Sequence, residues 1–218
     1  MTTEGGDATL ASPTTMTLAE RLKHATHQQH ESLHTVVDIT AALESMKAYR
    51  DLLGRFYRAV SSLECGQAEY VLSGASPGLD LKWPPRMQKT RWLADDWKAI
   101  NGRCQSGETD RGIVDPPELF EDEARRPLPV PDSPSTFAGR AYVLEGMTLG
   151  GQYIRRSIEK RWSIGGAGLR FFTGYGEQTG RCWNEFKSAL NVADVQVSNT
   201  ISAAQTAFDH FAKVYAGD

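Results

Sequence analysis

Helical periodicity is the sequence feature that most constrains this chain. Apolar residues recur three and four positions apart in long stretches, and no alternation of apolar and polar residues is long enough to indicate a sheet. One such stripe comprises Tyr49, Leu52, Leu53, Phe56, Tyr57, Val60 and Leu63, and another Val197, Ile201, Ala204, Phe208, Phe211 and Val214. The pattern predicts an all-α, single-domain bundle of six or seven helices without an internal repeat.

The N-terminal part divides into a leader and the start of a helical domain. Residues 1–16 are rich in Gly, Thr, Ser and Pro without periodicity, so we expect a disordered leader, followed by one helical domain over 17–216. Thr17 and Glu20 form a capping box, which starts a helix whose apolar positions continue to Leu33.

The middle of the chain contains the longest predicted loop. Pro84 and Pro85 are expected to open a helix that carries the aromatic residues before position 100, because proline is favoured in the first helical turn. Residues 101–136 are polar and hold six prolines, which predicts a long loop with one short helix at Pro117–Arg125. A long helix is expected after Pro134, and a last pair of helices follows it.

Charge and composition exclude several classes of partner. The 24 basic and 27 acidic residues give a net charge of −3 and are scattered, so a nucleic-acid partner is not expected. No run of eighteen apolar residues and no signal peptide is present, which predicts a cytoplasmic protein without a membrane span. Cys65, Cys104 and Cys182 match neither a zinc nor a disulfide pattern, and we expect reduced thiols.

Histidines are concentrated in the first predicted helix. His24, His27, His30 and His34 lie in LKHATHQQHESLHT, and a neutral imidazole can bind a metal. Lys23 precedes His30 by almost two turns, so on one helix the two would project from nearly the same side, roughly 10 Å apart along the axis. The pair suits a ligand with a metal at its centre and an acid at its rim. The alternative is that these are solvated surface residues.

Glycines interrupt the helix that follows Pro134. Gly146, Gly150 and Gly151 each cost a helix about 1 kcal/mol against Ala, and three together should bend or loosen it. Close approach of a flat ligand would explain them, and so would close helix packing or a helix break. A third stretch, FFTGYGEQTGRCWNEFKSAL, leads into a helix with Arg181 and Lys187, and by itself indicates only core and surface charge.

These three stretches, with AYRDLLGRFYRAVSSLE, resemble the heme oxygenase family over about Leu18 to Leu190, and in particular its bacterial, phytochrome-associated members. The resemblance implies a bundle that holds heme between a proximal helix and a glycine-rich distal helix. It implies cleavage of heme b, which is both substrate and cofactor, by O2 to biliverdin, carbon monoxide and ferrous iron. Electrons would come from a separate reductase or ferredoxin. The biliverdin would be the alpha isomer, and a phytochrome apoprotein could receive it.

The resemblance also implies roles for individual residues. His30 takes the place of the proximal ligand to the iron, and Lys23 that of a basic residue facing a propionate. The distal glycines let their helix lie against the porphyrin, with Gly146, Gly150 and Thr148 in the catalytic part. The implied heme contacts are Lys23, His30, Gly146, Met147, Gly150, Gly151, Arg181, Phe186 and Lys187, where Arg181 and Lys187 would contact propionates and Phe186 the ring.

Met147 departs from the family pattern, in which many members carry an aspartate that orders water for proton delivery. A thioether cannot relay a proton. Thr148, backbone carbonyls or Arg140 could organise the water instead. Alternatively, Met147 could ligate the iron opposite His30, which would give a non-catalytic heme-binding or carrier protein with the same fold.

Two other enzyme classes use helical bundles. Glu31 and His34 form the Glu-x-x-His step of di-iron carboxylate proteins, but the sequence has no second such step. A thiaminase-like enzyme would need a cysteine nucleophile beside carboxylates inside the bundle, and Cys65 has Glu64 and Glu69 nearby in sequence. The favoured interpretation of Cys65 is an ordinary small apolar residue near a helix end.

Overall fold

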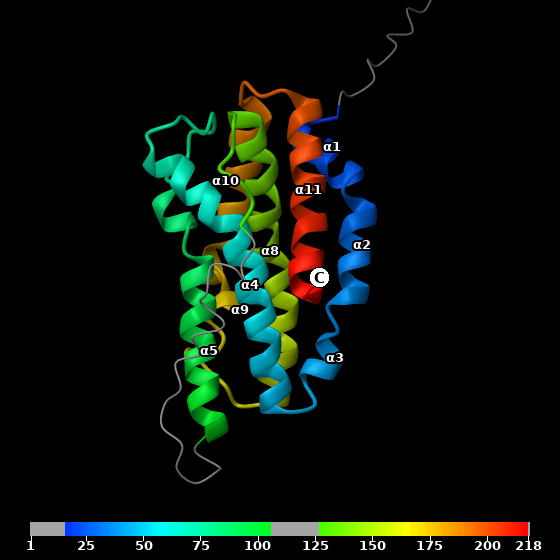
Figure 1. Ribbon diagram of the computed structural model, residues 1–218, viewed down its shortest axis with the longest axis vertical. Helices are drawn as coiled ribbons and strands as arrows, with labels where there is room; N and C mark the ends of the chain where they lie inside the picture. Colours follow the sequence, from blue (N-terminus) through cyan, green and yellow to red (C-terminus); the bar gives the residue numbers. More distant parts are fainter. Residues whose placement is uncertain (1–15, 106–126, 218) are drawn as a thin grey trace, which may run out of the picture.

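The computed structural model describes residues 16–105 and 127–217, and all regular elements in these two ranges are helical. The prediction of an all-α class is confirmed. The elements are α1 Leu18–Ala25, α2 His27–Val36, α3 Ile39–Ala42, α4 Met46–Leu72, the 3-10 turn η1 Pro84–Arg86, α5 Lys89–Gln105, α8 Pro134–Arg161, α9 Arg170–Thr173, the 3-10 turn η2 Gly176–Gln178, α10 Thr179–Val192 and α11 Val197–Ala216 (Figure 1).

Helix α11 is the central packing element. It contacts α8, α4, α1 and α2, and so connects α2 with α8 (Figure 1). The α8 and α11 backbones approach so closely at Gly139 that any Cβ there would collide with the Thr200 carbonyl oxygen. At the other end of α11, the rings of Phe211 and Tyr215 each lie within 5.6 Å of the Phe56 ring on α4. Helix α11 therefore fixes where α2 stands relative to α8.

Side-chain caps begin two helices, and the predicted capping box at the first of them is confirmed. The Glu20 carboxylate accepts the Thr17 N–H at 2.8 Å, and the Thr17 hydroxyl accepts the Glu20 N–H at 3.3 Å. Ser133 caps α8 in the same way through the Thr136 N–H, with Pro134 in the first helical turn.

The expected continuous first helix is wrong, because the helix breaks at Thr26. The Thr26 backbone leaves helical geometry at φ −106° and ψ 8°, and its buried hydroxyl donates to the Leu22 carbonyl at 2.8 Å. Such a bond to the preceding turn competes with regular helix geometry. Lys23 therefore lies on α1 and His30 on α2, and the straight-helix spacing between them does not hold.

The expected helix start at Pro84 and Pro85 is also wrong. These prolines form the 3-10 turn η1, and α5 begins at Lys89. The reason is a cap from another helix, since the buried Glu64 carboxylate of α4 accepts the Lys89 N–H at 3.0 Å and the Thr90 N–H at 2.8 Å.

Helix α5 extends to Gln105 and α8 begins at Pro134, so residues 101–105 and 134–136 of the predicted loop over 101–136 are helical. The predicted short helix Pro117–Arg125 and all but the last residue of the predicted leader lie outside the described residues.

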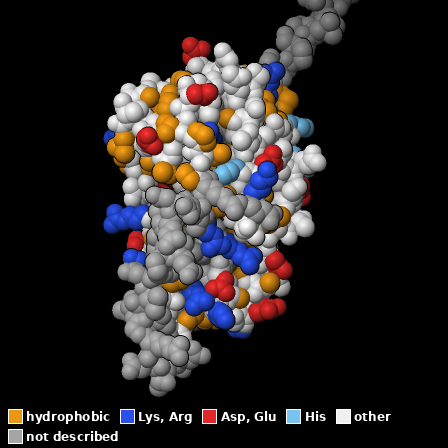
Figure 2. Space-filling view, viewed as in Figure 1, with side chains coloured by type: hydrophobic (Ala, Val, Ile, Leu, Met, Phe, Trp, Pro, Cys, Tyr) orange, Lys and Arg blue, Asp and Glu red, His pale blue; other side chains and the backbone are white. Residues whose placement is uncertain are grey.

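The surface carries both signs of charge. Figure 2 shows Lys and Arg interspersed with Asp and Glu in the lower half of one face, and apolar side chains gathered over the segment that joins α4 to α5. No helix within the described ranges is long and apolar enough to cross a membrane.

Candidate functional site

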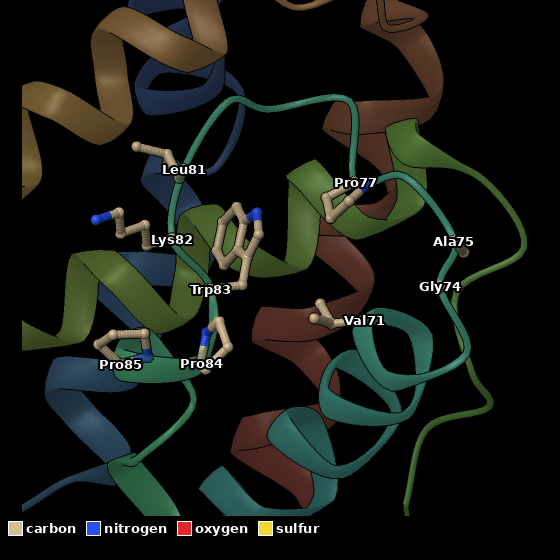
Figure 3. A pocket seen from close by; sticks show the side chains of 9 residues that line it. All are labelled: Val71, Gly74, Ala75, Pro77, Leu81, Lys82, Trp83, Pro84 and Pro85. Atoms are coloured by element: carbon tan, nitrogen blue, oxygen red, sulfur yellow. The ribbon is translucent and has the colours of Figure 1, made fainter.

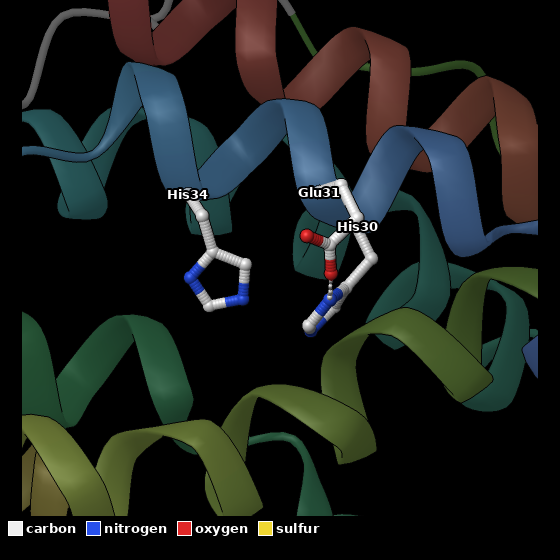
Figure 4. Close-up of side chains that lie close together, drawn as sticks. All are labelled: His30, Glu31 and His34. Carbon is white, nitrogen blue, oxygen red and sulfur yellow. Dashed lines mark ion pairs between the residues drawn. The ribbon is translucent and has the colours of Figure 1, made fainter.

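Three metal-binding side chains of α2 lie close together. The His30 Nδ1 atom is 3.8 Å from the Glu31 carboxylate, and the His30 and His34 ring centroids are 4.7 Å apart. Their possible ligand atoms all lie within 4.8 Å of one another. Figure 4 shows all three side chains extending from α2 toward the yellow-green helix α8. The His30 side chain therefore lies on the side of α2 that faces α8, and its role as a ligand of heme iron stays a prediction.

No residue of α2 is fully buried, and the His30 side chain is 56% exposed. Its ring stands edge-on to Phe208 of α11, with centroids 6.3 Å apart. His24 on α1 and His27 on α2 are exposed and lie outside the three-residue cluster.

One face of α8 is open and apolar. Gly146, Leu149, Gly150 and Tyr153 share this face, because they follow the i, i+3, i+4, i+7 spacing of a helix. A Cβ placed on Gly146 or Gly150 would meet no described atom within 4 Å. Leu149 is 38% and Tyr153 74% exposed. Nothing in the described fold requires glycine at 146 and 150, so close packing between helices does not explain these two glycines.

Gly151 has a different role from its two neighbours. A Cβ there would lie 3.2 Å from the carbonyl oxygen and 3.3 Å from the Cα of Phe172, next to α9. Close packing, the alternative that spacing left open, explains this glycine. The three glycines do not interrupt α8, which is one continuous helix over Pro134–Arg161.

The residues expected to organise water are bonded within the protein. The buried Thr148 hydroxyl donates to the Glu145 carbonyl at 2.7 Å. The buried Arg140 guanidinium donates to the Pro129 carbonyl. Met147 is partly buried and packs against the core.

The predicted propionate contacts lie on α1 and α10, two helices that pack against each other. Lys23 is exposed on α1, and Lys187 is half-buried on α10. Arg181 is ion-paired with Glu185 across one turn of α10 at 2.9 Å. Phe186 has no exposed surface, and the structure places its ring in the core rather than on an open face.

Sequence reasoning missed a buried charge network beside the open face. The Glu145 carboxylate, immediately before Gly146, pairs with Arg86 and with the Lys89 ammonium at 2.8 Å, and accepts the Tyr175 hydroxyl at 2.8 Å. Burial alone would lower the Lys89 pKa, but the Glu145 charge, with smaller contributions from other acidic groups, raises it above its ordinary value. A signal was available in the sequence, since Glu145 is the only charged residue in YVLEGMTLGG.

Asp96 of α5 was also missed. Its carboxylate accepts the backbone N–H groups of Gly168, Arg170 and Phe171 at 2.7 to 2.9 Å. Burial raises the Asp96 pKa to about 6, although these hydrogen bonds act in the opposite direction. Asp96 thereby fixes the start of α9, the helix that packs on Gly151.

The alternative enzyme classes find little support. In the described residues the only group of three possible metal ligands is the α2 cluster, so a di-iron bundle would lack its second half there. Cys65 is exposed, whereas Glu64 is buried and caps α5, so these two side chains do not share the bundle interior.

The lining of the pocket shown in Figure 3 includes neither the three clustered residues of α2 nor the open face of α8 at Gly146 and Gly150. Its lining residues belong to the end of α4 and the segment before α5, and are Val71, Gly74, Ala75, Pro77, Leu81, Lys82, Trp83, Pro84 and Pro85. It contains one charged side chain and no pair of groups suited to catalysis.

Comparisons with known proteins agree with this geometry. A family model described as heme oxygenase matches residues 16–216. Heme oxygenase 2 from Chlamydomonas reinhardtii, crystallised without heme, is similar with a TM-score of 0.69 at 21% identity, covering 92% of this chain and 96% of that one. The Neisseria meningitidis heme oxygenase, in its NO- and CO-bound structures, is similar with a TM-score of 0.67 at 21% identity, covering 92% of this chain and 91% of that one.

Heme oxygenase-1 from Synechocystis sp. in complex with heme gives a TM-score of 0.62 at 18% identity, covering 92% of this chain and 91% of that one. None of the curated proteins is significantly similar in sequence. The structural similarities establish a shared fold.

Proposed function

The chain belongs to the heme oxygenase family, and we propose that it is an active member that binds heme between α2 and the glycine face of α8 and cleaves it oxidatively. One observation carries the proposal. His30 is exposed and extends toward α8, whose face at Gly146 and Gly150 has open space where any other residue would place a side chain.

The residues on both helices fit heme. A neutral imidazole from His30 is a common ligand of heme iron. Leu149 and Tyr153 offer exposed apolar surface to a porphyrin, and glycine at 146 and 150 allows the ligand to approach the α8 backbone closely. Gly151 belongs to the distal glycine motif but supports the site indirectly, through its contact with α9.

Basic side chains would bind the propionates. We propose Lys23, Lys187 and Arg181 for this role, because they lie on the packed pair α1 and α10. Arg181 would have to exchange its pairing with Glu185 for a propionate. Phe186 would support the site from the core, behind the exposed surface of α10.

In the proposed reaction, bound heme is the substrate and also supplies the iron centre that activates O2. The products would be biliverdin, carbon monoxide and ferrous iron. The protein's part is to hold the iron through His30, to exclude bulk water with the apolar α8 face, and to organise protons on the distal side. The Thr148 hydroxyl retains an unused lone pair after donating to Glu145, so it can accept a hydrogen bond from water.

A non-catalytic heme carrier is the second candidate, and Met147 specifically favours it. In that case Met147 would leave its partly buried position and ligate the iron opposite His30, which would close the site where O2 reacts. The two functions share heme binding and differ in the fate of the reduced heme.

The proposed subgroup, location, product isomer and recipient rest on the resemblance of the sequence motifs to the family. We propose a cytoplasmic enzyme of the phytochrome-associated subgroup, which produces the alpha isomer of biliverdin for a phytochrome apoprotein. A separate reductase or ferredoxin would supply electrons, because no nucleotide-binding fingerprint occurs in the sequence.

The test is a hemin titration of the purified protein, its His30→Ala variant and a His27→Ala control. His27 is an exposed histidine on the same helix outside the cluster, so it reports any general effect of losing a histidine from α2. The hemin-loaded proteins are then reduced with ascorbate under air while the spectrum is followed.

We expect a Soret band in the wild type and in His27→Ala, and after reduction this band should give way to a biliverdin spectrum. In His30→Ala the Soret band should be lost or strongly shifted. A stable Soret band after reduction, with a six-coordinate low-spin iron that does not bind carbon monoxide, would instead establish the carrier. If His30→Ala bound hemin with an unchanged spectrum, the assignment of His30 would be wrong.

A further inference from the structure

We propose that His30, Glu31 and His34 form a metal site, which binds one divalent transition-metal ion without a porphyrin when the protein holds no heme. The ion and heme iron would then compete for His30. The inference concerns the heme-free protein, so it does not depend on whether the protein is an active oxygenase.

The geometry carries the inference. In the described residues this is the only group of three histidine, cysteine or carboxylate side chains whose ligand atoms gather within 4.8 Å. A tetrahedral zinc ion with bonds of about 2.0–2.1 Å places neighbouring ligands about 3.3 Å apart. The His30 to Glu31 distance of 3.8 Å is already close to this value.

Small rotamer changes would complete the site. All three side chains are exposed, and the aromatic contact that joins them to the core is the edge-on packing of the His30 ring against Phe208. His30 and His34 are separated by one turn of α2, which places both imidazoles on one side of the helix. Glu31 can approach from the adjacent position. The remaining coordination positions would be filled by water.

The donor set selects the type of ion. Two imidazoles and one carboxylate suit Zn²⁺, Co²⁺, Ni²⁺ or Fe²⁺, whereas Mg²⁺ and Ca²⁺ prefer all-oxygen ligands. Two histidines with one carboxylate is also a set that binds non-heme ferrous iron. If the proposed oxygenase reaction occurs, it would therefore release its ferrous ion close to three side chains that can bind ferrous iron.

The experiment uses the heme-free, full-length chain without a polyhistidine tag. Zn²⁺ binding is measured by calorimetry, and Co²⁺ is used as a probe because its visible absorption reports coordination number and ligand type. The variants are His34→Ala and Glu31→Gln, with His27→Ala as the matched control. Circular dichroism verifies that each variant remains helical.

We expect one Zn²⁺ per chain in the wild type and in His27→Ala. Removing a ligand in His34→Ala should weaken binding by about tenfold or more, since the loss of even an indirect partner of a metal ligand costs about 10–100-fold. Glu31→Gln should weaken binding less than His34→Ala, and the Co²⁺ spectrum should change in both variants.

Unchanged Zn²⁺ affinity in His34→Ala would refute the site. Equal losses in His34→Ala and His27→Ala would also refute it, because they would indicate diffuse binding to surface histidines. Both outcomes are independent of the hemin titration, so failure of this inference is distinguishable from failure of the proposed function.

Discussion

Replacing Gly150 by alanine should have opposite effects on the empty and the heme-bound protein. An added methyl group at this position meets no described atom within 4 Å. The substitution therefore removes only the conformational cost of glycine in a helix, and should stabilise the heme-free protein by about 0.5–1 kcal/mol. For a chain of 218 residues this raises the Tm by about 1–4 °C.

The same methyl group should weaken heme binding if heme lies against this face. Forcing one extra carbon into a packed contact costs about 1–3 kcal/mol, which corresponds to a loss of about 5-fold to 150-fold in affinity. The heme-free Tm is measured by circular dichroism, and the Kd for hemin by titration of the Soret band.

Gly102 provides the matched control. It lies in α5, outside the proposed heme site, and a Cβ there also meets nothing within 4 Å. Gly102→Ala should raise the Tm by a smaller amount, because the residue lies in the last turn of its helix, and should leave the Kd for hemin unchanged. A Gly150→Ala protein that bound hemin as tightly as the wild type would show that the open face of α8 does not contact the ligand.

Three further predictions concern the frame of the site. Lys89→Met should lower the free energy of unfolding by about 1–3 kcal/mol in urea denaturation, because it removes one buried partner of the Glu145 carboxylate while Arg86 and Tyr175 remain. Gly139→Ala should lower the Tm, or prevent folding, because the new methyl group would collide with the Thr200 carbonyl. Burial raises the Asp96 pKa from 3.8 to about 6, so the folded protein binds this proton more tightly than the unfolded chain. The wild type should therefore lose up to about 3 kcal/mol of stability relative to Asp96→Asn as the pH rises from about 4 to 6, measured by urea denaturation at each pH.

Local patterns predicted helices well wherever the determining contacts were local. The Thr17 and Glu20 capping box was predicted from the sequence because its two partners lie three residues apart. The start of α5 was not readable, because its cap comes from Glu64, 25 positions away from Lys89. A sequence pattern cannot reveal a helix cap that another helix supplies.

The candidate site was predictable in part for the same reason. The α2 histidines and the glycines of α8 stand out within their own segments. Spacing alone could not separate Gly150, which has open space, from Gly151, which packs on Phe172, because that difference depends on where α9 lies. The position of α9 depends in turn on three backbone bonds to Asp96, 72 to 75 residues away.

The two sides of the proposed heme site are held by different means. On the α8 side, glycines weaken the helix, but Gly139 locks it against α11 and the Glu145 network anchors it to α5 and η1 directly before Gly146. This anchoring lets the open face persist without a ligand. Helix α2 buries no residue completely and is held mainly against α11, where His30 meets Phe208. Because the proposed iron ligand stands on the weakly held side, an ion or heme bound through His30 would supply contacts that α2 does not obtain from the core.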